Sequence, residues 1–298
     1  MFKAGIELKV RAKSIGRLFL EGSNHNFFIK HVFNHTVYLK EETTGNMYLV
    51  SSYPWRSPYT INIPPTPQPL SALVKPLAEA ELKEKILFLQ PNLEIILEEA
   101  NLYDGLGLGC GSKRFSEKDL LRLATAFNIL SSLWRDLDSR PEYKRVCRVM
   151  AEPPILKEEN ILALVGLGGG FTPSGDDFLT GYIGALVFNA IRCGGKTGLP
   201  LINPVVLDRT TWASRNYLVY SMNGIYDELA ERALYSLFSG DFDEAINTLI
   251  GYSRRGHESG LYIWLGLITG YIDLLYKSPS LSYKMFCQHN VRRGRADG

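Results

Sequence analysis

The sequence lacks the features that mark several large classes of protein. Its 298 residues include 33 Lys and Arg against 31 Asp and Glu, so there is no positive excess of the kind that predicts nucleic-acid binding. The most apolar stretch, residues 261–276, is shorter than a bilayer span and contains Asp273. We therefore expect a globular protein with neither nucleic acid nor membrane as a partner.

Cysteine is scarce as well. The chain has 4 cysteines, which are far apart and form no CxxC pair: Cys110, Cys147, Cys193 and Cys287. This spacing argues against the common zinc and thioredoxin-like motifs. The first residues lead straight into an alternating pattern without the outline of a signal peptide. The expectation is a cytoplasmic protein whose thiols are free.

The first part of the chain reads as strands. Apolar and polar residues alternate in five short segments, at 6–11, 17–21, 28–32, 36–40 and 47–51. Thr44-Gly45-Asn46 is suited to a hairpin turn between the last two. His25, His31 and His35 lie here without a carboxylate or cysteine at ligand spacing, so we interpret them as ordinary strand and turn residues. Residues 1–64 are thus predicted to form a small β barrel or sandwich.

A proline-rich segment follows, and after it the hydrophobic period becomes helical. Residues 65–76 are predicted to be a stiff linker, because four prolines fall within Pro64–Pro69. Helices are predicted at 77–90, 93–100, about 116–137, 140–150, 175–192, 205–222, 224–238, 241–252 and 260–276. Ser116 and Asp119 have the spacing of a capping box. The predicted class is α+β, with a mainly α-helical domain at 77–288 and a solvated basic tail at 289–298.

The most informative stretch is Gly166–Asp177, where four glycines in five residues precede Thr172-Pro173-Ser174-Gly175-Asp176-Asp177 and a helix. Glycines let a ligand approach main-chain N–H groups closely, and a helix start favours anions. We predict a site for a small anionic, phosphorylated ligand. Its candidate ligand-binding residues are Gly168, Gly169, Gly170, Thr172, Ser174 and Gly175. The stretch fits neither the Walker nor the Rossmann pattern, and a tight packing turn is the alternative.

Asp176 and Asp177 complicate a bare phosphate site, because two carboxylates repel an anion. One reading places a divalent cation such as Mg²⁺ between them, and another places a cationic or amine group of the ligand there. In a third reading one aspartate caps the helix, since Ser174 and Asp177 have capping-box spacing, while the other faces the substrate as a proton acceptor. Both aspartates are therefore candidate catalytic and metal-binding residues.

Two further segments stand out. The glycine-rich run 105–111 is interpreted as a flexible connection, with a second ligand loop as the alternative. In Arg254–Gly260, Ser259-Gly260 is followed seven residues after the serine by Gly266, just as Ser174-Gly175 is followed by Gly181. Two Ser-Gly helix starts that meet around one site, or a coincidence in a glycine-rich chain, explain this equally well. In the first case Ser259 and Gly260 bind the ligand, and His257 contacts the anion or transfers a proton.

These motifs together resemble the AllH-type family of oxamate carbamoyltransferase subunits, otherwise known as a domain family of unknown function. The resemblance rests on Gly168–Asp177, on Thr210-Thr211-x-x-Ser214, and on Gly256-His257-x-Ser259-Gly260. In that family an acidic residue often follows the second Ser-Gly, whereas Leu261-Tyr262-Ile263 stand here. The resemblance implies transfer of a carbamoyl group between carbamoyl phosphate and oxamate, in allantoin and purine breakdown, together with partner subunits.

No obvious pair of nucleophile and base accompanies these motifs. A non-catalytic ligand-binding or scaffold subunit is therefore kept as the alternative to an enzyme, with a purely structural protein as a third possibility. No cofactor is assigned beyond the optional Mg²⁺.

Overall fold

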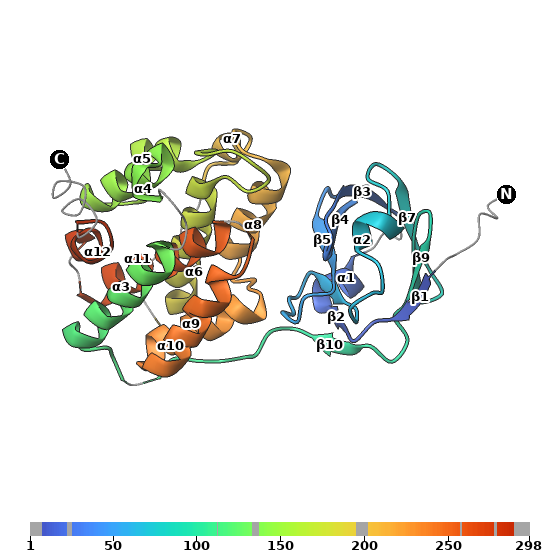
Figure 1. The fold of residues 1–298 in the computed structure, drawn as a ribbon, viewed down its shortest axis with the longest axis horizontal. Coiled ribbons are helices and arrows are strands. Elements are labelled where there is room, and N and C mark those ends of the chain that lie inside the picture. The colour runs from blue at the N-terminus through green and yellow to red at the C-terminus, as the bar shows by residue number, and fades with distance from the viewer. Residues whose placement is uncertain are drawn as a thin grey trace. The chain divides into compact units, whose positions relative to one another are not determined.

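The computed structural model describes residues 8–22, 26–111, 113–132, 137–194, 202–256, 258–276 and 279–288. The chain divides into two compact units, Met1–Gly107 and Leu108–Gly298. The first unit is built on a curled mixed sheet and the second on helices (Figure 1). The predicted α+β class is confirmed.

The sheet of the first unit has 10 strands in the order β1-β9-β8-β7-β3-β4-β5-β6-β2-β10. Their bounds are β1 Leu8–Arg11, β2 Ser14–Gly16, β3 Asn26–Val32, β4 Thr36–Glu41, β5 Met47–Ser51, β6 Thr60–Asn62, β7 Glu79–Lys83, β8 Ile86–Leu89, β9 Leu93–Ile96 and β10 Asn101–Tyr103. Two short helices, α1 (Arg17–Glu21) and α2 (Leu70–Leu73), accompany it. The turn predicted at 44–46 joins β4 to β5, with Gly45 at φ +74°.

One short segment explains why the sheet curls. β1 and β2 follow each other directly, yet β1 pairs with β9 near one end of the strand order and β2 pairs with β6 and β10 at the other. Between them, the Ala12 N–H donates to the Ile96 carbonyl at 2.8 Å and the Lys13 N–H to the Asn62 carbonyl at 2.7 Å. The same few residues thus join both ends of the sheet, which bends it towards a barrel.

Two helix predictions in this unit were wrong. Residues 77–90 and 93–100 form strands β7 to β9, because Ala, Leu, Glu and Lys favour helix locally but tertiary pairing overrides that propensity. Residues 17–21, predicted as a strand, form α1. The proline-rich segment lies inside the first unit, which continues to Gly107, so the boundary falls within the glycine-rich run 105–111.

The second unit contains α3 (Glu117–Ser132), the 3₁₀ helix η1 (Leu137–Ser139), α4 (Pro141–Ala151), α5 (Glu158–Leu164), α6 (Ser174–Arg192), α7 (Pro204–Leu207), α8 (Trp212–Met222), α9 (Glu228–Ser239), α10 (Phe242–Ser253), α11 (Ser259–Tyr276) and α12 (Pro279–Phe286). The sequence pattern missed α5 and α12 and merged α7 with α8. The Ser116–Asp119 capping box is confirmed, since the Asp119 N–H donates to Ser116 Oγ at 3.2 Å and the Ser116 N–H to Asp119 Oδ2 at 3.2 Å.

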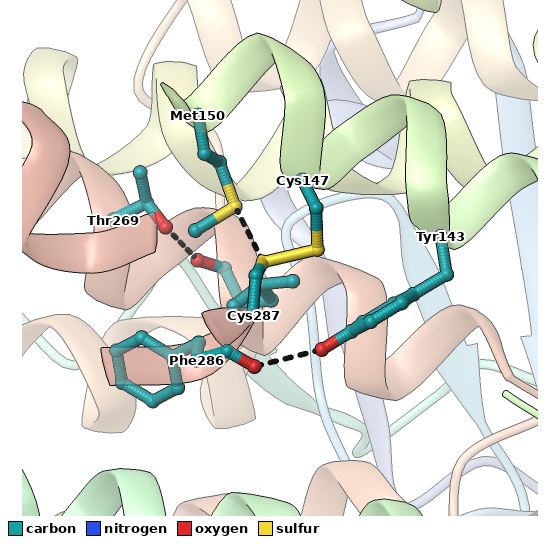
Figure 2. Close-up of a disulfide and its surroundings, with 7 residues drawn as sticks. Tyr143, Cys147, Met150, Thr269, Phe286 and Cys287 are labelled. Carbon is teal, nitrogen blue, oxygen red and sulfur yellow. Dashed lines mark hydrogen bonds between the residues drawn. A yellow bond between two sulfur atoms is a disulfide. The ribbon is translucent and has the colours of Figure 1, made fainter. Parts of the chain in front are cut away.

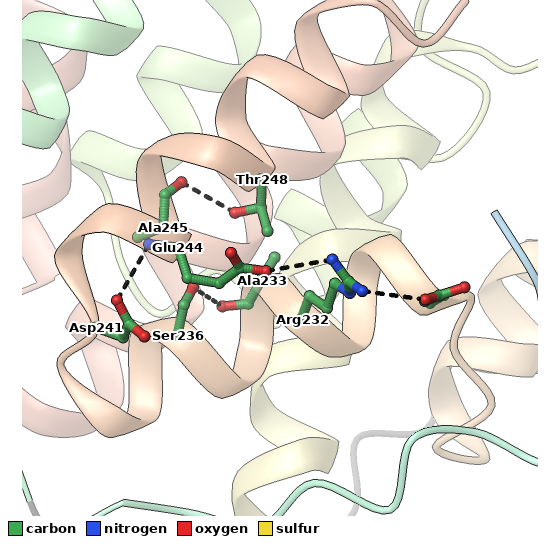
Figure 3. Close-up of polar contacts among 8 residues, drawn as sticks. Arg232, Ala233, Ser236, Asp241, Glu244, Ala245 and Thr248 are labelled. Atoms are coloured by element: carbon green, nitrogen blue, oxygen red, sulfur yellow. Dashed lines mark hydrogen bonds and ion pairs between the residues drawn. The ribbon is translucent and has the colours of Figure 1, made fainter. Parts of the chain in front are cut away.

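Aromatic and charged contacts hold these helices together. Phe127 of α3 stacks on Trp264 of α11 with ring centroids 5.8 Å apart, and both side chains are buried. Arg232 of α9 pairs with Glu228 one turn earlier at 3.3 Å and with Glu244 of α10 at 3.8 Å (Figure 3). The helices of the second unit are therefore packed against one another through both apolar and charged side chains. No helix in the described part of the chain is long and apolar enough to cross a membrane.

The cysteines contradict the expectation of free thiols. Cys110 is bonded to Cys193, and Cys147 of α4 is bonded to Cys287 just after α12. Around the second bond, the Tyr143 hydroxyl donates to the Phe286 carbonyl at 2.8 Å (Figure 2). Spacing alone could not reveal the pairing, because the partners are 83 and 140 residues apart.

Candidate functional site

The glycine-rich loop between α5 and α6 has three residues in the left-handed region: Gly166 at φ +75°, Gly168 at +107° and Gly170 at +86°. A Cβ on Gly166 would also lie 2.7 Å from the Arg209 carbonyl oxygen. Backbone conformation thus explains three of the glycines. Gly169 differs, because its φ is outside that region and a Cβ there would meet nothing within 4 Å. The free fold gives no steric reason for a glycine at this position.

The start of α6 is fixed by the backbone and not by the predicted Ser174–Asp177 capping box. Pro173 is the N-cap and makes no side-chain capping bond. The Gly175 N–H donates to the Leu167 carbonyl at 3.0 Å, which ties the helix start to the loop. A Cβ on Gly175 would lie 2.1 Å from the Leu164 carbonyl oxygen, so packing explains this glycine.

Both carboxyl oxygens of Asp176 accept hydrogen bonds from other groups of the protein. Its Oδ1 accepts a hydrogen bond from the Gly166 N–H at 2.9 Å, and its Oδ2 accepts one from the Thr210 hydroxyl. The side chain is buried, and burial raises its pKa while these donors act in the opposite direction. Asp176 therefore joins the loop to the segment before α8, and both of its oxygens are already used.

Asp177 is also buried, with 5% of its surface exposed, but its Oδ2 has no hydrogen-bond partner among the described residues. Burial raises the pKa of Asp177 well above its usual range, and the neighbouring Asp176 adds to this. The hydroxyls of Ser259 and Thr172 lie close enough to lower it again. An unsatisfied buried carboxyl oxygen is costly to a fold, so it marks a position available to a ligand.

The starts of α6 and α11 lie together. Thr172 Oγ1 and Ser259 Oγ share a hydrogen bond of 2.9 Å at these starts. Further along, a Cβ on Gly181 would lie 2.0 Å from the Ile263 carbonyl oxygen, and one on Gly270 would lie 2.7 Å from Cβ of Ala185. Successive contacts in the same order mean that the helices run in the same direction, so both positive dipole ends face one place.

Charged residues surround the second helix start in pairs. Arg255 forms an ion pair with Asp227, the N-cap of α9, and its charge also acts on Asp177. Glu258, only 9% exposed, forms an ion pair with Arg140, the N-cap of α4. Both arginines are thus already neutralised in the free protein.

Of the remaining predicted residues, Gly260 is described by the structure and His257 is not. Gly260 is explained by packing, because a Cβ there would lie 1.9 Å from the Tyr252 carbonyl oxygen. His257 and the basic tail 289–298 lie outside the described residues. Among the described residues no group of three or more His, Cys, Asp and Glu side chains could hold a metal ion. With both oxygens of Asp176 engaged, the geometry offers no support for Mg²⁺ between the two aspartates.

Two buried residues beside the start of α11 are not among the residues predicted from the sequence. Glu258 lies within a charged run, and Tyr262 lies within an apolar helix, so neither stands out by residue type. Tyr262 is 2% exposed, and its hydroxyl has no hydrogen-bond partner among the described residues. Only its position could have indicated Tyr262 from the sequence, because Tyr262 follows Ser259 by three residues just as Asp177 follows Ser174.

A family model matches the part of the chain that contains this site. The family model described as oxamate carbamoyltransferase subunit AllH matches residues 164–271, from the end of α5 through most of α11. The matched segment contains both helix starts and Thr210, so the resemblance noted in the sequence is confirmed there. The family is named for a subunit, which implies partner subunits. Comparison with curated proteins and with solved structures gives no match.

Proposed function

We propose that this protein binds a small anionic ligand of the carbamoyl phosphate type where α6 and α11 begin, as a subunit of a carbamoyltransferase of the kind named by its family model. The observation that carries the proposal is Oδ2 of Asp177, which has no hydrogen-bond partner among the described residues and is buried between two helix starts that point the same way. The match over 164–271 supports the same region.

A ligand of this type has groups that match both the glycine-rich loop and Asp177. The N–H groups of Gly168–Gly170 and the positive ends of both helices favour phosphate or carboxylate oxygens. The carbamoyl group or an amide carries N–H donors, which Asp177 can accept. Burial favours the protonated form of Asp177, and this removes the repulsion that a second carboxylate would otherwise exert on an anion. A cation between the aspartates is then not required.

Whether the subunit catalyses the transfer itself is a separate question. The described residues around Asp177 include hydroxyls of Thr172 and Ser259 but no histidine or lysine in hydrogen-bond contact with them. This favours, as second candidate, a ligand-binding subunit whose chemistry is completed by a partner. His257 stays the predicted proton-transfer residue for the catalytic case.

Two adjacent substitutions test the proposal. Asp177→Leu replaces both carboxyl oxygens by methyl groups on the same branched skeleton, so we expect it to stay folded and to weaken binding of carbamoyl phosphate at least about tenfold. Asp176→Asn replaces an acceptor oxygen of the loop by an amide donor, so we expect it to lower the free energy of unfolding by about 1–3 kcal/mol. Calorimetric titration with carbamoyl phosphate, oxamate and inorganic phosphate, beside urea unfolding, measures both. Equal ligand affinity in Asp177→Leu and wild type would contradict the proposal.

Gly169→Ala supplies a second test, aimed at the loop. A Cβ at Gly169 meets nothing in the free fold, so we expect unchanged stability. It would stand where ligand oxygens approach the N–H groups, so we expect weaker binding of phosphate and carbamoyl phosphate. Loss of stability instead, without loss of affinity, would show that the loop serves packing alone.

A further inference from the structure

The two Ser-Gly helix starts share a third position besides the serine and the packing glycine. In α6, Ser174 is followed by Asp177 at the third residue and by Gly181 at the seventh. In α11, Ser259 is followed by Tyr262 and Gly266 at the same intervals. One helix start therefore carries a carboxyl group where the other carries a phenol.

Packing makes these positions equivalent in space as well as in sequence. A Cβ on Gly266 would lie 2.1 Å from the Phe178 carbonyl oxygen and 3.1 Å from Cα of Gly181, so the two glycines face each other. Because the helices run in the same direction, each serine faces the opposite helix at the residue three positions after that helix's own serine. The Ser259 hydroxyl acts on Asp177, and the Ser174 hydroxyl acts on Tyr262.

The Tyr262 hydroxyl, like Oδ2 of Asp177, has no hydrogen-bond partner among the described residues. It is buried, and no described residue forms a hydrogen bond of acceptable geometry with it, Ser174 included. Burial raises the pKa of Tyr262, and the nearby carboxylates of Glu258 and Glu142 raise it further. The phenol is therefore protonated throughout the ordinary pH range and can act as a donor. A buried donor without an acceptor costs free energy in the free fold.

We propose that Tyr262 is a ligand-contacting residue, whose hydroxyl donates to an oxygen of the same ligand that presents N–H groups to Asp177. This deepens the proposed function and rests on it. Asp177 offers an acceptor and Tyr262 a donor. Together they favour a ligand that has both an amide-type N–H and an anionic or carbonyl oxygen. Carbamoyl phosphate and oxamate have both, and inorganic phosphate has no N–H.

Tyr262→Phe removes the hydroxyl and little else. We expect it to lower the affinity for carbamoyl phosphate and oxamate about three- to tenfold, the effect of one neutral hydrogen bond. The midpoint of thermal unfolding should stay equal or rise, because the variant loses a buried hydroxyl that has no partner among the described residues. Tyr103→Phe, which alters a buried tyrosine of the other compact unit, is the matched control and should change neither affinity.

The outcomes separate this inference from the proposed function. Unchanged affinity in Tyr262→Phe, with binding weakened in Asp177→Leu, overturns the role of Tyr262 alone. A lower unfolding midpoint in Tyr262→Phe, with affinity reduced only in proportion to unfolded protein, assigns the phenol to packing and also overturns it. Absence of binding by the wild-type full chain to carbamoyl phosphate, oxamate and phosphate overturns both proposals.

Discussion

Adjacent residues of one type have different roles here because their surroundings differ. Asp176 and Asp177 follow one another at the start of α6, and both are buried. Donors from the loop and from Thr210 use both oxygens of Asp176, whereas one oxygen of Asp177 is unpartnered among the described residues. An acidic pair in a sequence therefore need not be a metal site. One carboxylate can join a loop to a neighbouring segment while one oxygen of the next carboxylate has no partner among the described residues.

Asp273 of α11, a half-buried carboxyl, predicts a pH-dependent stability. It accepts a hydrogen bond from the Tyr182 hydroxyl at 3.0 Å, and its other oxygen has no partner among the described residues. Burial raises its pKa from 3.8 to about 6. The folded state thus holds this proton more tightly, so the stabilisation is complete below about pH 4 and is lost as the pH rises to about 6.

Asp273→Asn should remove this dependence. We expect the variant to be more stable than wild type at pH 7.5, by at most roughly 3 kcal/mol for a shift of about two pKa units, and not at pH 4. Urea unfolding at both values measures it, with Asp243→Asn, an exposed aspartate, as control. A gain of equal size at both pH values would show that the carboxyl is not the titrating group.

At the scale of elements, the site depends on how closely α6 and α11 approach. Glycines at 181, 266 and 270 leave no room for a side chain between the helices. Intimate contact brings the two starts within reach of one hydrogen bond between Thr172 and Ser259. The glycines of the helix interiors are thus part of the site's construction although they touch no ligand.

Gly181→Ala tests this directly. Its Cβ would meet the Ile263 carbonyl oxygen at 2.0 Å, and backbone cannot move aside cheaply, so we expect a loss of about 1–3 kcal/mol in the free energy of unfolding. Gly184→Ala, one turn later, would first meet the Ser221 hydroxyl at 3.1 Å and should cost much less. Chemical unfolding of both variants decides the matter, and equal midpoints would contradict the packing argument.

At the scale of the whole molecule, the two compact units are stabilised differently. Both disulfides lie in the unit that begins at Leu108, and one of them fastens the end of α12 to α4 (Figure 2). α4 begins beside the site, because Arg140 pairs with Glu258 and a Cβ on Gly168 would lie 3.3 Å from Cγ of Glu142. Covalent closure of such long loops restricts the unfolded chain.

Reduction should therefore weaken the helical unit. A thiol titration of the unreduced protein, unfolded in denaturant, should find no free thiol. Adding a phosphine reductant should lower the stability of the helices by on the order of 4 kcal/mol for each bond. Far-ultraviolet circular dichroism during urea unfolding follows this, with the Cys147→Ala, Cys287→Ala double variant isolating one bond. Four titratable thiols without reductant would contradict the pairing.

The sequence determined much of the helical unit and of the site's outline. Periodic apolar residues located α4, α6, α10 and α11 to within a residue or two, because an amphipathic helix encodes its buried face locally. The glycine-rich loop and the repeated Ser-Gly spacing indicated two related helix starts. The family resemblance rested on the same residues.

Tertiary structure alone decided the rest. Residues 77–100 became strands because pairing with β3 and with β1 outweighed helix propensity. The pairing of cysteines, the different roles of Asp176 and Asp177, and the juxtaposition of Ser174 with Tyr262 all depend on contacts between distant segments. Local pattern carries no information on which distant group meets which, and burial, which sets the state of each carboxyl, exists only after the helices have packed.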